Sequence, residues 1–329
     1  MRNERKETED ARDLPVKEAA AAFLKERICG IAAFGNGHIN ETFIVKTEKE
    51  RYICQRIRSK MDTAVLEHNY RLYSGALDRE GLLYPVWMQT ERKEYFYRDA
   101  GGAHWRMYPL IEGEEREAPL TDELLRGCGQ GLAKMHRVLQ TLKGKPLAVY
   151  PMLHDLKYYH DEYLKVIGNG LSGEAREPAL EAWIGKKAGG FLEVKTDRGA
   201  VIHGDPKLAN ILFRDDTVRA FLDLDTLMPG SIAEDTADCI RSCCVRDGKP
   251  DRDAVRIFTD AYRNEAPELL KETDGERLML LLRKIFFELG LRYYTDAVAK
   301  EKHFKEKYPG YLKEKAEKYL EASAVEIRI

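Results

Sequence analysis

Three classes of protein are disfavoured by what the sequence lacks. No apolar run approaches the roughly 20 residues that a membrane-spanning helix needs, and the charged opening segment MRNERKETEDARDLP has no apolar stretch of the kind found in signal peptides. The 54 lysines and arginines nearly balance the 56 aspartates and glutamates, so the net charge is −2. Most nucleic-acid-binding domains are instead strongly basic. We therefore expect a cytoplasmic protein that binds neither membranes nor nucleic acids.

Cysteine is scarce, with 6 among 329 residues. No two cysteines stand as Cys-x-x-Cys, and the group Cys239, Cys243 and Cys244 has no matching pair of cysteines or histidines at zinc spacing. Neither a disulfide framework nor a zinc site is indicated. We interpret the cysteines as small buried side chains in a reducing compartment.

The first part of the chain has the pattern of a small sheet decorated with helices. A helix is predicted from Val16 to Ile28, and apolar residues at helical spacing predict a second over 62–79. Segments rich in β-branched and aromatic residues predict strands at 31–34, 42–47, 52–57, 83–89, 94–98 and 104–111. This part is expected to be a mainly antiparallel sheet.

After Glu112-Gly113 the pattern becomes mainly helical. Helical spacing of apolar residues predicts helices over 121–141, 155–168, 174–196, 233–246, 251–264, 275–299 and 310–323. Thr121 is a good N-cap for the first of them, and short strands are expected over 200–226. The predicted class is α+β, with a domain boundary that divides residues 1–107 from residues 108–329.

The segment VIHGDPKLANILFRDDTVRAFLDLDT places several chemically active side chains beside apolar strands. Phosphoryl transfer needs a carboxylate that accepts the proton of the attacking hydroxyl, and oxygen ligands that hold Mg²⁺ against the phosphates. Asp205 fits the first role as a catalytic base. Asn210 and Asp223 fit the second as metal ligands, and Asp225 can assist them.

Lys207 and His203 belong to the same segment. Lys207 can bring its ammonium group to the transferred phosphate, whereas His203, directly after an apolar strand, suits the organisation of the loop better than the role of base. The alternative is that His203, Asp205 and Asn210 only hydrogen-bond a buried turn. The occurrence of the whole set between two apolar strands favours the catalytic interpretation.

This segment resembles the aminoglycoside phosphotransferase and choline kinase-like family, whose loop reads H-G-D-x-x-x-x-N. The family's metal aspartate stands about 18 residues after the base, as Asp223 stands after Asp205. Other blocks are similar to the N-acetylhexosamine 1-kinase branch of the family: FGNGHINET from Phe34, ICQRI from Ile53, WRMY from Trp105, IEG from Ile111, LDLDT from Leu222, MPG from Met228 and ELGLRYYTD from Glu288.

The resemblance implies a protein kinase-like bilobal fold that uses ATP and Mg²⁺. Residues 1–107 would form a small antiparallel β-rich N-lobe that binds the nucleotide. Residues 108–329 would form the hinge and a larger, mainly helical C-lobe that carries catalysis and substrate binding.

The resemblance also implies a set of nucleotide-binding residues. Gly35, Asn36 and Gly37 would approach the phosphates with backbone N–H groups, because glycine permits close approach; a simple hairpin turn explains the same residues. Met107 and Tyr108 lie in the segment that would connect the lobes and contact adenine.

The chain departs from kinase-like folds at the lysine of the third strand, which pairs with a helix glutamate and holds the α/β-phosphates. Gln55 and Arg56 stand where that lysine is expected, and strand alternation lets only one of them face the nucleotide. Glu67, on the following helix, is the partner suggested by its position. An exposed helix carboxylate is the alternative for Glu67.

Three further residues are implied to bind the substrate together with Asp205. His38 and Asn40 would lie near the sugar, with His38 the better candidate for a sugar hydroxyl. Arg292, in a helix that otherwise has the pattern of a core helix, would contact a sugar hydroxyl or an amide carbonyl. A surface histidine in a turn and a salt bridge of Arg292 to an acidic neighbour are the alternatives.

These residues predict an ATP-dependent kinase whose partner is a small sugar. If the branch resemblance holds, the acceptor is the anomeric hydroxyl of N-acetylglucosamine or N-acetylgalactosamine, and the 1-phosphate feeds amino-sugar salvage. Choline, homoserine, a methylthio-sugar or an aminoglycoside stays open as the acceptor, although the basic residues of the 280–310 segment disfavour a polycation. A catalytically silent nucleotide-binding regulator is favoured by the missing strand lysine and disfavoured by the intact set around Asp205.

Overall fold

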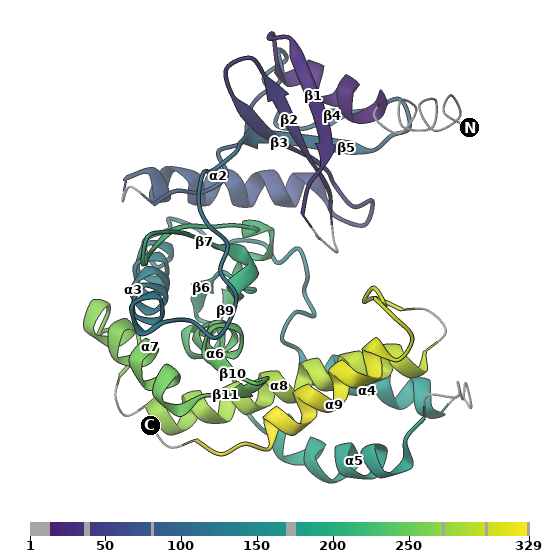
Figure 1. Cartoon of the computed structure of the whole chain (residues 1–329), viewed down its shortest axis with the longest axis vertical. Coiled ribbons are helices and arrows are strands. Elements are labelled where there is room, and N and C mark those ends of the chain that lie inside the picture. Colours follow the sequence, from purple (N-terminus) through teal and green to yellow (C-terminus); the bar gives the residue numbers. More distant parts are fainter. Residues whose placement is uncertain are drawn as a thin grey trace. The chain divides into compact units, whose positions relative to one another are not determined.

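The computed structural model describes residues 14–35, 40–79, 82–168, 176–271, 274–299 and 302–327 (Figure 1). The chain separates into two compact units, Met1–Glu112 and Gly113–Ile329. No helix in the described part of the chain is long and apolar enough to cross a membrane.

A five-stranded antiparallel sheet with the order β1-β2-β3-β5-β4 forms the first unit. Its strands are β1 (Ile28–Ala33), β2 (Glu41–Thr47), β3 (Arg51–Arg56), β4 (Tyr97–Arg98) and β5 (His104–Pro109). The turn between β2 and β3 is closed by Thr47, whose hydroxyl accepts the backbone N–H groups of Lys49 and Glu50 at 3.3 and 3.1 Å.

The two faces of this sheet pack against different helices. On one face Tyr52, Trp105 and Met107 join a core with the helix at 14–23. Because side chains alternate along a strand, Arg106 points to the other face. There Trp87 lies beneath the Arg106 guanidinium and stacks on Tyr70 of α2 (Thr63–Arg79), with ring centroids 4.3 Å apart.

Two sequence predictions for this unit are wrong. The first helix ends at residue 23, and β1 already begins at Ile28, where a helix was expected. No regular strand forms over residues 83–89. Tyr84 and Trp87 are buried there by aromatic contacts with Tyr73 and Tyr70 of α2. These apolar side chains therefore pack against a helix and do not belong to a strand of the sheet.

The second unit is mainly helical. Its helices are α3 (Asp122–Leu139), α4 (Leu156–Gly168), α5 (Pro178–Leu192), α6 (Ile232–Cys243), α7 (Arg252–Glu265), α8 (Gly275–Val298) and α9 (Tyr311–Ser323). Thr121 caps α3 by accepting the backbone N–H of Leu124 at 3.4 Å, as the sequence predicts. The helices expected from apolar spacing are all present, with ends that differ by a few residues.

One apolar core of this unit joins α4, α5, α8 and α9, which lie together in Figure 1. Phe287, Leu291 and Tyr294 of α8 are fully buried in it. Helices α8 and α9 approach closely at Gly290, where an added Cβ would come within 2.6 Å of Leu320 Cγ. This close contact fixes α8, which carries several of the charged residues described below.

Short strand pairs hold the segment that follows α5. Strand β6 (Ala200–Ile202) pairs with β9 (Met228–Gly230), and β7 (Ile211–Arg214) pairs with β8 (Thr217–Phe221). A third pair, β10 (Val245–Arg246) and β11 (Lys249–Pro250), follows α6. The loops between β6 and β7 and between β8 and β9 carry the predicted catalytic and metal residues.

Candidate functional site

The loop between β6 and β7 brings Asp205, Lys207 and Asn210 together. Lys207 Nζ donates to Asp205 Oδ2 at 2.5 Å. Asn210 Nδ2 donates to the backbone carbonyl of Asp205 at 2.9 Å and lies 3.4 Å from its Oδ2. A carboxylate, an ammonium group and a carboxamide therefore meet within one short segment.

Gly204 gives this loop a sharp turn. Its φ of +89° lies in the region that side chains disfavour. An added Cβ would also lie 2.4 Å from the carbonyl oxygen of Thr226, in the neighbouring loop. Only glycine therefore lets the segment before Asp205 pass so close to the loop that follows β8.

His203 organises the loop and is not exposed to a substrate. Its Nε2 lies 2.9 Å from the carbonyl oxygen of Leu222, and its Nδ1 lies 3.2 Å from the backbone nitrogen of Asp205. These partners require a neutral ring that donates from Nε2 and accepts at Nδ1. Complete burial lowers the pKa of His203 and favours that neutral form. The predicted role of His203 as a loop-organising residue agrees with these contacts.

Asp235, in the first turn of α6, is a residue that the sequence analysis missed. Its Oδ1 accepts the backbone N–H of Gly204 at 2.8 Å, and its Oδ2 accepts that of His203 at 2.9 Å. His136 of α3 brings its Nε2 to 2.8 Å from the same Oδ2. The acidic start of α6 was visible in the sequence, but nothing in its spacing linked it to residues 203 and 204.

Asp223 lies two residues after the end of β8, in the left-handed conformation with φ of +59°. The Thr226 hydroxyl donates to its carbonyl at 3.1 Å, and the backbone N–H of Leu222 donates to the carbonyl of Asn210 at 2.8 Å. These bonds tie the Asp223 loop to the Asn210 turn. Asp225 is buried in the short helical turn that follows.

The charges around Lys207 support this proximity. Burial favours the neutral amine, but the carboxylates of Asp205 and then Asp223 outweigh it and raise the pKa of Lys207. The side chain is about one third exposed, at 38%. Lys207 is therefore a cation close to the Asp205 carboxylate and under the influence of Asp223, and its side chain still reaches solvent.

Asn210 and Asp223 offer the donor atoms that Mg²⁺ prefers. Because Asn210 donates through Nδ2, its amide oxygen keeps an acceptor role, and Asp223 adds a carboxylate. Within the described residues, no group of three or more His, Cys, Asp and Glu side chains is placed to hold a metal. Mg²⁺ usually takes one or two protein carboxylates and completes its shell with phosphates and water.

A buried group of charges lies behind the loop. His154 Nε2 lies 2.8 Å from the carbonyl oxygen of Gly204. Burial favours the neutral ring, but the carboxylates of Glu288, Asp238 and Glu234 outweigh it and raise the pKa of His154. Asp238 Oδ1 accepts from Arg241 Nε at 2.8 Å. The loop is thus anchored by Asp235 of α6 and by His154, as well as by its own strands.

Arg292 of α8 is held by neighbours from three directions. Its guanidinium lies 4.4 Å from the Tyr159 ring centroid and 5.4 Å from that of Phe304. Glu288 Oε1, one helical turn earlier, is 3.6 Å away. Both the aromatic contacts and the salt bridge that the sequence left as an alternative are present, and the side chain remains 25% exposed.

The predicted glycine-rich turn and two of the predicted sugar residues, His38 and Asn40, belong to the first unit. Gly35 has a φ of +73°, with nothing within 4 Å of an added Cβ. Asn36, Gly37 and His38 lie outside the described residues. Asn40 is buried, and its Oδ1 accepts the backbone N–H of Arg58 at 3.1 Å, a contact that closes the chain around the end of β3.

The side chains of Gln55, Arg56 and Glu67 contact different partners. Gln55 shares the α2 side of the sheet with Arg106, and its Oε1 accepts from Arg106 Nε at 3.0 Å. Arg56 instead forms an exposed pair with Glu41 at 3.3 Å. Glu67 forms an ion pair with Arg71 on its own helix at 2.6 Å, and not with Gln55 or Arg56 of β3 as expected.

Met107 and Tyr108 stand at the end of β5. The Met107 side chain is fully buried in the core with the helix at 14–23, and its carbonyl accepts the backbone N–H of Met88 at 2.8 Å. Tyr108 pairs with Ile53 in the β3–β5 ladder. Any nucleotide contact by Met107 must therefore come from its backbone.

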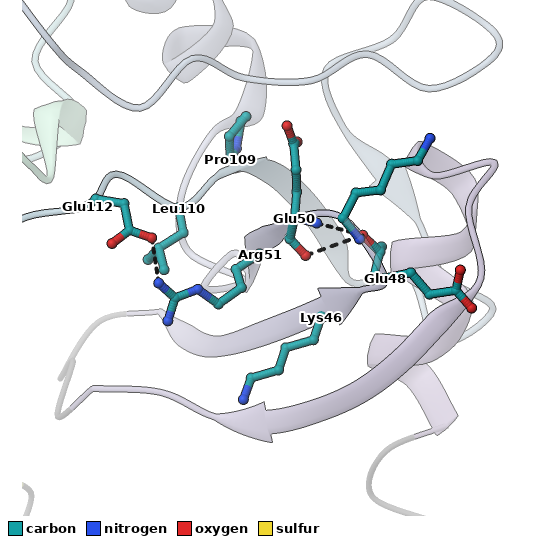
Figure 2. Close-up of a pocket in the computed structure, with 9 residues that line it drawn as sticks. Lys46, Glu48, Glu50, Arg51, Pro109, Leu110 and Glu112 are labelled. Atoms are coloured by element: carbon teal, nitrogen blue, oxygen red, sulfur yellow. Dashed lines mark hydrogen bonds and ion pairs between the residues drawn. The ribbon is translucent and has the colours of Figure 1, made fainter.

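A surface pocket of about 360 Å³ lies at the other end of β3, beside the β2–β3 turn and the last residues of the first unit. Figure 2 shows Arg51 directed toward Glu112, with which it forms an ion pair. The pocket is lined by three basic residues, Lys46, Lys49 and Arg51, and by three acidic residues, Glu48, Glu50 and Glu112. This balance of charge favours no class of ligand.

Comparison with known proteins identifies relatives of this arrangement. Residues 30–270 match the sequence profile of the phosphotransferase enzyme family. Among solved structures, the aminoglycoside phosphotransferase from Alicyclobacillus acidocaldarius is similar with a TM-score of 0.65 and 14% identity, over 94% of each chain. The amicoumacin kinase hAmiN, solved in complex with AMP-PNP, Ca²⁺ and Ami, has a TM-score of 0.65 and 14% identity, over 98% of this chain and 96% of that one.

Choline kinase from Cryptosporidium parvum is similar with a TM-score of 0.59 and 13% identity, over 96% of this chain and 95% of that one. At sequence identities of 13–14%, these similarities support a shared fold and not a shared substrate. It confirms the expected α+β kinase-like class, in which an antiparallel five-stranded sheet precedes a mainly helical part.

Proposed function

Because the chain belongs to the phosphotransferase enzyme family, we propose that it transfers the γ-phosphate of ATP to a hydroxyl group of a small sugar. The observation that carries this proposal is the meeting of Asp205, Lys207 and Asn210 in one loop. Two of the similar structures were solved with ATP or an ATP analogue, in amicoumacin kinase and in a streptomycin complex of an aminoglycoside phosphotransferase.

These contacts support the chemistry that we assign to the loop. Asp205 orients the acceptor hydroxyl and takes its proton, while Lys207 neutralises charge that develops on the transferred phosphoryl group. Asn210 and Asp223 would hold Mg²⁺, with Asp225 assisting, and the bound metal would neutralise charge on the phosphates. Positioning and electrostatics do most of the work in this class of reaction.

The division of labour between the two parts of the chain belongs to the same proposal. Residues 1–107 bind the nucleotide, through backbone groups at Gly35, Asn36 and Gly37 and near Met107 and Tyr108. Residues 108–329 supply the catalytic loop and the acceptor site.

For the acceptor we propose N-acetylglucosamine or N-acetylgalactosamine, phosphorylated at the anomeric hydroxyl. The support comes from the sequence blocks quoted above and from Arg292, a partly exposed guanidinium held by two aromatic rings that can bind a hydroxyl or an amide carbonyl. His38 and Asn40 complete the assigned sugar contacts. An aminoglycoside or choline is the second candidate, because similar folds belong to enzymes named for those substrates.

The experiment is ADP release from Mg-ATP with N-acetylglucosamine, N-acetylgalactosamine, choline, homoserine or kanamycin as the acceptor. Phosphorus NMR of the product identifies the phosphorylated position. We expect turnover of an N-acetylhexosamine to an anomeric phosphate. Turnover of another acceptor alone would remove the sugar assignment and keep the Asp205 mechanism, whereas ATP binding without turnover of any acceptor would favour a silent regulator.

A further inference from the structure

Helix α6 lies alongside the catalytic loop. Asp235, in the first turn of the helix, accepts the backbone N–H of Gly204 at 2.8 Å. Ser242, about two turns later, accepts the backbone N–H of Leu208 at 2.8 Å through its hydroxyl. Residues seven positions apart share a face of a helix, and α6 also packs against α8 (Figure 1). The stretch of α6 between these two contacts therefore borders the part of the loop that carries Asp205.

Arg241, near the end of this stretch, has one fixed nitrogen and two open ones. Its Nε donates to Asp238 Oδ1 at 2.8 Å. Among the described residues, neither Nη1 nor Nη2 of Arg241 has a hydrogen-bond partner, and neither atom is buried from solvent. The Arg241 side chain as a whole is only 10% exposed. Its surroundings thus hold the guanidinium in place and leave its two terminal nitrogens accessible to a ligand.

This guanidinium lies close to the proposed base. Burial favours its neutral form, but the carboxylates of Asp238 and Asp205 outweigh burial and raise the pKa of Arg241. Arg241 also opposes the rise that Asp205 causes in the pKa of Lys207. Both effects act through space and weaken with distance. Arg241 is therefore within electrostatic reach of the two residues assigned to the acceptor proton and to the transferred phosphoryl group.

Arg241 and Arg292 are neighbours of the same aromatic group. Tyr293 of α8 stacks on Phe304, with ring centroids 4.0 Å apart and planes inclined by 8°. The Arg292 guanidinium lies 5.4 Å from the Phe304 ring centroid. Burial raises the pKa of Tyr293, and both Arg241 and Arg292 oppose that rise. Arg241 therefore stands between the base and the aromatic group that holds Arg292, which the proposed function assigns to the acceptor.

We infer that Arg241 is a further acceptor-binding residue, whose Nη1 and Nη2 donate to oxygen atoms of the substrate while Asp238 positions the guanidinium. This inference rests on the proposed function and deepens it, because it specifies the chemistry of the acceptor beside Asp205. A guanidinium has five donors and no acceptor. It binds hydroxyl or carbonyl oxygens, whereas a cationic acceptor such as choline or an aminoglycoside would bring positive charge against it.

The test is the steady-state kinetics of ADP release with N-acetylglucosamine as the acceptor, for wild type, Arg241→Met and Arg241→Lys. We expect Arg241→Met to raise the KM for the sugar by about 10- to 100-fold, the effect of losing hydrogen bonds to a charged group. The KM for ATP should change by less than about twofold, because Arg241 contacts the acceptor. Arg241→Lys keeps the charge without the planar fork and should fall between the two. Arg256→Met removes an exposed arginine of α7 and is the matched control, which should alter neither KM.

Substrate analogues separate a direct contact from a structural role. The kinetics are repeated with analogues of N-acetylglucosamine that each lack one hydroxyl other than the anomeric one, and with glucose, which lacks the acetamido group. An analogue that lacks the group bound by Arg241 should raise the KM of wild type, yet raise that of Arg241→Met by less than about twofold, because the contact is already lost. A structural effect of Arg241→Met would instead add to the effect of every analogue.

The inference is overturned by equal rises in the two KM values of Arg241→Met, by additive effects for every analogue, or by turnover of choline or kanamycin in preference to the sugar. If Arg241→Met does not fold, the double variant Asp238→Asn/Arg241→Met, which removes both charges, takes its place and the same outcomes decide. A wild-type protein that released no ADP with any acceptor tried would refute the proposed function. Normal wild-type turnover with an unchanged KM for the sugar in Arg241→Met would refute this inference alone.

Discussion

Asp235 Oδ1 accepts the backbone N–H of Gly204 at 2.8 Å, one residue before the proposed base. The second oxygen of the same carboxylate serves His203 N–H and His136 Nε2. Asp235 is fully buried, so each of these donors would lose its partner in a dry environment if the carboxylate were removed. Asp235 of α6 therefore fixes the loop that carries Asp205. The two segments are about 30 residues apart in the sequence, so the contact could not be predicted from a local motif.

Replacement of Asp235 by alanine should destabilise the protein strongly. Three buried donors would be left without an acceptor, and we expect a loss of about 3–5 kcal/mol in the free energy of unfolding, measured by urea denaturation. Asp260→Asn, which alters an exposed carboxylate on α7, is the control and should stay within about 0.5 kcal/mol of wild type. A stability of Asp235→Ala equal to that of the control would show that the contacts to the loop are not needed.

Asp205→Asn tests the base directly. Asparagine keeps the shape and a hydrogen-bond acceptor for Lys207 but cannot take a proton, so kcat should fall by about 10²- to 10⁴-fold while ATP still binds. Turnover is followed by ADP release, and nucleotide affinity by calorimetry on the same protein. Asp215→Asn, in the exposed β7–β8 turn with φ of +53°, is a matched control that should leave both unchanged. Normal turnover by Asp205→Asn would remove this residue from the role of base.

Much of the fold follows from local patterns. The helix α8 and the capped helix α3 are visible because apolar spacing and an N-cap are properties of consecutive residues. The error at residues 83–89 has a physical cause, since Tyr84 and Trp87 are equally suited to a strand or to packing against α2. Short strands such as β10 and β11 carry too few residues for any pattern.

In the candidate site, too, contacts within one short motif could be predicted from the sequence, and contacts between distant segments could not. Asp205, Lys207 and Asn210 lie within six residues, so their meeting could be predicted from one motif. Asp235 reaches Gly204 from 31 positions away, and Arg106 reaches Gln55 from 51. Those contacts depend on how α6 packs and on how β3 pairs with β5, which a single sequence does not encode in its spacing.

Glu234 and Lys284 form a buried ion pair between α6 and α8 at 2.8 Å, with side chains 4% and 6% exposed. Removal of one partner leaves an unpaired buried charge, so Glu234→Gln and Lys284→Met should each cost about 3–5 kcal/mol of unfolding free energy. The double variant should lose clearly less than the sum, as a double-mutant cycle measures. The exposed pair Glu314–Lys318 is the control, with an expected coupling of only about 0.3–0.5 kcal/mol. Additive losses at Glu234 and Lys284 would show that the pair is not coupled.

His154 should make stability depend on pH. Although burial opposes the charge, the carboxylates of Glu288 on α8 and of Asp238 and Glu234 on α6 raise the pKa of His154 above its usual value. A group whose pKa is higher in the folded state stabilises it fully below the unfolded pKa, near 6.5, and this contribution is lost as pH rises through the folded pKa. His154→Asn, which tolerates the φ of +59°, should therefore cost most at about pH 6, roughly 1–3 kcal/mol, and less at about pH 9. The measurement is urea unfolding of both proteins across this range, with His68→Asn on the exposed side of α2 as the control. A stability difference that stayed constant with pH would mean that His154 anchors Gly204 as a neutral ring.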